Sequence, residues 1–131
     1  MLIRKIGFAA LSIALITGSG VALASEKEWK NTPQNWSWGA EPQCKLKVTQ
    51  VSQPNESQPI HVTVVNVSQV RLQYSLQVRV VRAGKEVFKD TIMVDNANPG
   101  ESSMRPTSQR LQGTLAGASV RLSLQSCSLR S

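Results

Sequence analysis

The chain reads VRLQYSLQVRV at residues 70–80, an unbroken alternation of apolar and polar side chains. A period of two indicates a β-strand with one buried face, because successive strand side chains point to opposite sides. The predicted core face consists of Val70, Leu72, Tyr74, Leu76, Val78 and Val80, and the predicted outer face consists of Arg71, Gln73, Ser75, Gln77 and Arg79. The fold therefore includes a strand that packs against a core on one side only.

Other strand-like runs lie on both sides of this stretch and are separated by turn residues. They cover 44–51, 60–67, 86–94 and 118–127, and no segment has a helical period of useful length. Gly84 is suited to the positive φ of a tight hairpin, and Pro106 places its segment at the edge of a sheet or in a loop. We predict an all-β fold, an antiparallel β-sandwich of immunoglobulin-like size with about six or seven strands. Its domain would cover residues 44–131.

The first 24 residues read MLIRKIGFAALSIALITGSGVALA. Arg4 and Lys5 precede an apolar run of residues 6–16, and the segment closes with an A-x-A pattern that ends at Ala24. This combination is typical of a secretory signal peptide, and the apolar run is too short for a stable membrane span. We therefore expect cleavage after Ala24, no stable membrane anchor, and a periplasmic or secreted monomer of one domain.

Two cysteines, Cys44 and Cys127, follow the predicted leader. Export to an oxidising compartment predicts a disulfide between the first and the last strand of the domain, and two buried free thiols are the alternative. Cys127 has the outward parity of its run, because the apolar residues of that run have even numbers. A bulge or a strand end near Ser126 would resolve this parity.

The charge of the chain is moderately basic. Fifteen Lys and Arg residues against eight Asp and Glu give a net charge of +7, and loss of the leader reduces it to +5. The basic residues do not form a clustered run, which disfavours nucleic acid in an exported protein. Acidic proteins, anionic glycans or lipid head groups are the more suitable partners.

The sequence contains no pattern of residues that predicts catalysis. His61 is the one histidine, and an exposed strand position explains it better than a metal site does. Residues 95–101 resemble a calcium loop, but Ala97 and Pro99 offer no side-chain oxygen where ligands are needed. N-x-S sequences begin at Asn35, Asn55 and Asn66, and we interpret them as chance. We expect no enzymatic activity, no metal and no cofactor.

The polar face of residues 71–79 is the first candidate binding site. Arg71, Gln73, Gln77 and Arg79 follow one side of this strand, Lys45 and Lys47 have the corresponding parity in the 44–51 run, and Arg121 and Gln125 have it in the last run. If these strands share a sheet, they form a flat, mildly basic surface for an acidic or β-rich protein partner. An ordinary solvated face, with charges that prevent aggregation, is the alternative.

Residues 25–43, SEKEWKNTPQNWSWGAEPQ, contain all three tryptophans, two prolines and no clear period. We predict an irregular strap. Trp36 and Trp38 would face the same way in an extended chain and could stack on a glycan or other ligand, which is the alternative binding site. Equally, the strap could fold over one end of the sandwich and bury them, and this is the interpretation that we favour.

The pattern YSLQVRVVRAGKEVF…NPGESS…LAGASVRLSLQSC, within residues 74–127, is similar to that of small exported bacterial sandwiches. It combines a Y-x-L-x-V strand, a glycine hairpin, a P-G-E turn and a final V-x-L-x-L strand. Among these proteins it resembles the periplasmic curli-assembly modules that keep amyloid subunits from polymerising early. The resemblance implies a non-catalytic chaperone or inhibitor whose basic sheet face meets an acidic client.

Overall fold

A computed structural model describes residues 26–38 and 41–130, but not the side chains of residues 37–43. The predicted signal peptide, residues 1–24, lies outside the described residues. In the part of the chain that is described, no helix is long and apolar enough to cross a membrane.

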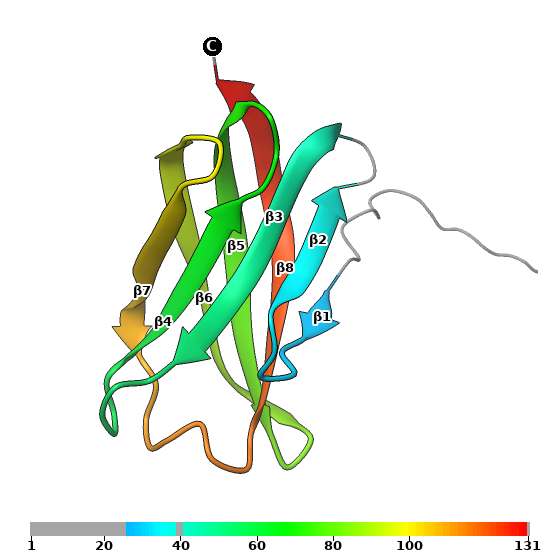
Figure 1. Cartoon of the computed structure of the whole chain (residues 1–131). Helices are drawn as coiled ribbons and strands as arrows, with labels where there is room; N and C mark the ends of the chain where they lie inside the picture. The colour runs from blue at the N-terminus through cyan, green and yellow to red at the C-terminus, as the bar shows by residue number, and fades with distance from the viewer. Residues whose placement is uncertain (1–25, 39–40, 131) are drawn as a thin grey trace, which may run out of the picture.

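Eight strands form two antiparallel sheets (Figure 1). They are β1 (Lys27–Glu28), β2 (Gln34–Trp38), β3 (Glu41–Ser52), β4 (Pro59–Asn66), β5 (Arg71–Arg82), β6 (Lys85–Ala97), β7 (Ser102–Arg110) and β8 (Ser119–Arg130). Sheet A has the order β1-β8-β5-β6, and sheet B has the order β2-β3-β4-β7. The predicted all-β, antiparallel two-sheet architecture is thus confirmed, with eight strands described instead of six or seven.

The core lies between the two sheets and uses the alternation read from the sequence. Leu72, Tyr74, Leu76, Val78 and Val80 of β5 are all buried, and Val70 packs against the core from just outside the strand. In β4 the burial pattern alternates at every residue. The strands β3, β4, β5, β6 and β8 therefore contribute apolar side chains to a shared core and leave their polar faces on the outside of the sandwich.

The turn between β5 and β6 has the predicted hairpin geometry. Two residues connect the strands, Ala83 with φ of 53° and Gly84 with φ of 79°. Positive φ at both central residues is what a type I′ turn requires, and this turn suits the twist of a hairpin. Glycine adopts that conformation without strain, whereas alanine does so at a cost.

The predicted positions of Pro106 and Cys127 are both confirmed. Pro106 lies in β7, which is an edge strand of sheet B and pairs only with β4 in the described fold. In β8, Ser126 pairs with Ser75 of β5, but the next pair joins Leu124 to Leu76, so that Gln125 is an extra residue. This bulge reverses the parity after Leu124 and turns Cys127 toward the other sheet.

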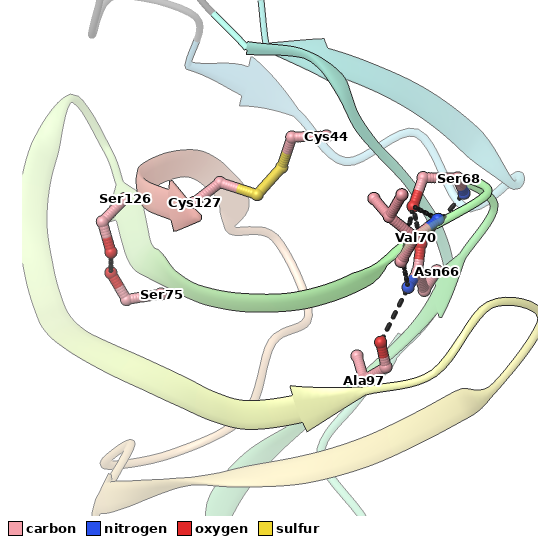
Figure 2. The surroundings of a disulfide bond; sticks show 8 residues. All are labelled: Cys44, Asn66, Ser68, Val70, Ser75, Ala97, Ser126 and Cys127. Carbon is pink, nitrogen blue, oxygen red and sulfur yellow. Dashed lines mark hydrogen bonds between the residues drawn. A yellow bond between two sulfur atoms is a disulfide. The ribbon is translucent and has the colours of Figure 1, made fainter. Parts of the chain in front are cut away.

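A disulfide joins Cys44 of β3 to Cys127 of β8, as predicted, and connects the two sheets (Figure 2). The two cysteines are 83 positions apart in the chain. Closing a loop of this length removes conformational entropy from the unfolded chain, which stabilises the fold by about 4 to 5 kcal/mol on the chain-entropy account. The bond is compatible with an oxidising, exported compartment.

Asn66 connects the end of β4 to sheet A (Figure 2). Its side chain is buried, with 1% exposed, and its Nδ2 donates to the carbonyls of Val70 and Ala97 at 2.9 and 2.8 Å. Its Oδ1 accepts hydrogen bonds from the backbone N–H and the hydroxyl of Ser68. Asn66 therefore has a structural role, and its amide is not accessible for glycosylation in the folded protein.

The N-terminal segment is less irregular than the sequence predicts. Lys27 and Glu28 pair with β8 at the edge of sheet A, and residues 34–38 pair with β3 at the edge of sheet B. The prediction of an irregular strap is therefore wrong for these two stretches. Short edge strands of this kind depend on the hydrogen bonds of a neighbouring strand, so they need no alternation of their own.

Candidate binding face

Basic side chains form a row across three neighbouring strands on the outer face of sheet A. Arg79 of β5 lies directly opposite Lys89 of β6 on one side and Arg121 of β8 on the other. All three point away from the core, since Val78 and Val80 on either side of Arg79 are fully buried. We call Lys89, Arg79 and Arg121 the basic row.

A second basic pair lies near the other end of the same face. Arg71 of β5 is opposite Arg130 of β8, and Arg130 donates a hydrogen bond from a terminal guanidinium nitrogen to Oε1 of Gln73 at 2.9 Å. Arg71 and Arg79 are eight positions apart on one strand, which separates the two groups by roughly 26 Å. The outer face of sheet A thus has positive charge at both ends.

Small neutral polar side chains occupy the surface between these two basic groups. Gln77 is opposite Ser123 and Ser75 is opposite Ser126. The hydroxyls of Ser75 and Ser126 are 2.6 Å apart, and Gln125 Nε2 donates to the Ser123 hydroxyl at 3.1 Å. Ser75 and Ser123 are themselves buried, so the hydrogen-bonding groups that this part of the face offers a polypeptide backbone belong to Gln77, Gln125 and Ser126.

Two carboxylates neutralise part of the basic row. Glu26 accepts two hydrogen bonds from Arg79, at 2.8 Å from Nε and 3.0 Å from a terminal nitrogen, and its Oε1 is 3.7 Å from Arg121. Glu86 forms a further ion pair with Arg79 at 3.1 Å. The hydrogen bonds that Arg79 donates lower the pKa of Glu26 below its ordinary value of 4.5, and acceptance by the carboxylates of Glu26 and Glu86 raises the pKa of Arg79.

The structure divides the residues that the sequence places on one face. Arg71, Gln73, Gln77 and Arg79 do lie on the outer face of sheet A, as does Arg121. Lys45 and Lys47 belong to β3 in sheet B, where Lys47 is opposite Val65. The expectation that β3 shares this face is therefore wrong. In sheet B, β3 pairs with β2 and β4, and its covalent connection to β8 in sheet A is the disulfide.

The tryptophans do not form an exposed pair. Trp36 is 3% exposed and belongs to the core, as the interpretation of a packed strap predicts, and Nζ of Lys27 lies 5.7 Å from the centre of its ring. Trp29 packs against the core and donates from its indole nitrogen to Asn31. Trp38 lies in β2, but the structure does not describe its side chain. A glycan would have to open the edge of the sandwich to reach Trp36.

No group of three or more His, Cys, Asp or Glu side chains within residues 26–38 and 41–130 is arranged to hold a metal ion. His61 is a half-buried residue of β4, opposite Ser52 and Pro106. Residues 98–101 form a turn in which Glu101 accepts a hydrogen bond from the backbone N–H of Asn98. The carboxylate of Glu101 thus stabilises its own turn.

The sequence interpretation missed three members of this site. Glu26 was within the predicted strap, and Glu86 and Lys89 were not among the candidate site residues. A two-residue turn alone would place Phe88 opposite Arg79. One extra residue, Val87, shifts the register of β6, so that Phe88 pairs with Val80 and Lys89 reaches Arg79. The signal in the sequence was the parity of Phe88, which enters the core only after such a shift.

No known protein family matches the chain, and no curated protein or solved structure matches it either. Its class is therefore stated from the coordinates alone: an all-β domain of two four-stranded antiparallel sheets, connected by a disulfide, with a basic row on the outside of sheet A.

Proposed function

We propose that this protein is an exported, non-catalytic binding module that holds an extended, acidic segment of a protein partner against the outer face of sheet A. The module works in the periplasm, as a monomeric immunoglobulin-like β-sandwich. The client that the sequence resemblance implies is an amyloid subunit of the curli type, which the module keeps from polymerising early.

The observation that carries the proposal is the alignment of the basic row. Like charges directly opposite each other in a sheet are destabilising, yet Lys89, Arg79 and Arg121 are in register across three strands. Glu26 and Glu86 offset part of this repulsion. The aligned row of three basic residues is what a site for an anionic partner requires.

The size of the face fits a chain in extended conformation. Neighbouring strands are about 4.8 Å apart, so that the basic row is roughly 10 Å wide, and a neutral polar stretch separates it from Arg71 and Arg130. An acidic segment that lies along this face would meet positive charge at each end and hydrogen-bonding groups between them. This length and chemistry favour a polypeptide over a small ligand.

The alternative function, glycan binding by Trp36 and Trp38, has less support. The ring of Trp36 is buried in the core and offers no face for stacking. A glycan that binds by stacking would quench tryptophan fluorescence on titration, whereas a partner on sheet A would leave Trp36 in its buried environment.

The proposal is tested by neutralising the basic row at its two outer members. Lys89→Gln with Arg121→Gln removes two charges from sheet A and keeps the pair of Arg79 with Glu26. Lys45→Gln with Lys47→Gln removes the same charge from sheet B and is the matched control. The measurement is the lag time of polymerisation of a purified curli-type subunit, followed by thioflavin T fluorescence in the presence of each protein.

The parent and the sheet B variant should both lengthen the lag, and the sheet A variant should lose most of this effect. Because the attraction is electrostatic, added salt should shorten the lag that the parent produces. Equal inhibition by both variants, or no inhibition by the parent, would contradict the proposal.

A further inference from the structure

The carboxylate of Glu26 occupies the basic row from within the same chain. Its two oxygens face Arg79 in a paired arrangement, at 2.8 and 3.0 Å, and Arg121 lies 3.7 Å from one of them. Glu28, two positions further along, is directly opposite Arg121. Both acidic residues therefore point to the outer face of sheet A, where an acidic partner would have to bind.

The strand that carries these residues is unusually short. Within the described residues β1 pairs with only two residues of β8, Arg121 and Leu122, and one further hydrogen bond joins the backbone N–H of Trp29 to the carbonyl of Val120. Beyond Leu122 the described chain provides no strand neighbour on this side of β8, which continues to Arg130. β1 thus has few backbone hydrogen bonds to β8, and it is also held by Lys27, which donates to the carbonyl of Asn35, and by Gln34, which donates to the carbonyl of Glu28. Once these contacts open, the edge of β8 can accept another strand.

We propose that Arg79 and Arg121 form a carboxylate-binding site at the edge of sheet A, and that β1 occupies it as an internal substitute for a strand of the partner. The partner strand carries two acidic residues separated by one residue, as Glu26 and Glu28 are. It replaces β1, pairs antiparallel with β8, and continues along the edge from Ser123 toward Arg130. This inference rests on the proposed function and places one strand of the partner at the edge of sheet A, beside the outer face.

The spacing of the two acids follows from strand geometry. Alternate side chains of a strand face the same side, so only acids at positions i and i+2 both reach the outer face. Added strands also gain main-chain hydrogen bonds that do not depend on sequence, while the paired acids provide the specificity. Since Glu26 is tethered next to its site, it competes at a high effective concentration and weakens the binding of any acidic strand.

The test uses the exported chain and two synthetic peptides. The acidic probe is Thr-Val-Glu-Val-Glu-Val-Thr with a fluorescent label, and its control has glutamine in place of both glutamates. Glu26→Gln removes the internal competitor. Glu56→Gln, at an exposed position of the distant 53–58 turn, makes the same change in net charge and is the matched control.

Glu26→Gln should bind the acidic peptide about fivefold more tightly than the parent or Glu56→Gln, measured by fluorescence anisotropy. The glutamine peptide should show no such gain in affinity. The double variant Glu26→Gln/Arg121→Gln should lose the gain in affinity for the acidic peptide. A second measurement reports on β1 itself. Hydrogen exchange of the Trp29 amide should accelerate when the acidic peptide binds the parent, because that amide loses its bond to Val120.

Unchanged or weaker binding by Glu26→Gln, with an unchanged Trp29 amide, would overturn this inference and leave β1 a fixed edge strand. The proposed function would survive that result if the sheet A variant still lost its effect on subunit polymerisation. It would fail separately if both sheet variants inhibited polymerisation equally.

Discussion

Arg79 of β5 and Arg121 of β8 lie directly opposite each other on the outer face of sheet A, and both approach the carboxylate of Glu26. The two arginines repel each other, and the shared anion offsets that repulsion. The same contact holds the N-terminal strand in place. The stability of the fold and the proposed binding of a partner thus depend on the same three charges. The response of this group to pH follows from the pKa of Glu26.

Acid should remove the stabilising contribution of Glu26. Its folded-state pKa is lowered, chiefly by the hydrogen bonds from Arg79, below the ordinary value of 4.5. The contribution is therefore fully present above that ordinary value and is lost as the pH falls through the folded-state pKa. Urea unfolding of the parent and of Glu26→Gln should differ above pH 4.5, and the difference should shrink as the pH falls below that value. A difference that persists in acid would show that the carboxylate charge is not responsible.

Tyr74 should make the protein sensitive to alkali. Burial raises the pKa of its phenol from 10.0 to about 12, and it is the one tyrosine of the chain, so absorbance at the tyrosinate band follows it directly. A folded-state pKa above the unfolded value means that stability is intact below pH 10 and decreases as the pH rises toward 12. Tyr74→Phe should lack this component of the decrease. Titration of the native protein with the ordinary pKa would contradict the burial of the phenol.

Replacement of Asn66 by alanine should be strongly destabilising. The side chain donates to two carbonyls and accepts two hydrogen bonds from Ser68, all at the point where β4 meets sheet A. Loss of these bonds leaves buried polar groups unpaired, and we expect a decrease of about 2 to 4 kcal/mol in the free energy of unfolding. Asn55→Ala, at an exposed position with the same N-x-S context, should change it by less than about 0.5 kcal/mol. Similar effects of the two substitutions would argue against the hydrogen-bond network.

The β5–β6 hairpin offers a stabilising substitution. Ala83 has a φ of 53°, a conformation that costs an alanine roughly 1 kcal/mol and that asparagine tolerates better. Ala83→Asn should raise the free energy of unfolding by about 0.5 to 1 kcal/mol. Ala116→Asn, which introduces the same side chain at an exposed loop position without positive φ, is the control and should be neutral. Thermal unfolding of the three proteins compares them directly.

The alternation of residues 70–80 predicted the buried face of β5, and the two-residue turn and Pro106 predicted the hairpin and the edge strand β7. The odd parity of Cys127 predicted the bulge in β8. Each of these features depends on local chemistry or on a strict period of two, both of which are visible in sequence.

The features that the sequence did not predict depend on pairing between distant segments. Nothing in Lys45 or Lys47 indicates that β3 joins sheet B, and β1 is too short to have a period. The basic row depends on the register shift at Val87, and the position of Glu26 depends on which strand provides an edge. Sequence alone therefore identified Arg79 as a candidate but not the carboxylate that binds it.

The bond between Cys44 and Cys127 makes most of the domain a covalent ring. This ring includes both strands of the β5–β6 hairpin, the 53–58 turn and the loop between β7 and β8. A single cut by a protease anywhere inside that ring opens it without releasing a fragment. The nicked protein keeps every strand attached and can close again around the same core. A single break in the backbone inside the ring therefore leaves the domain in one covalently connected piece.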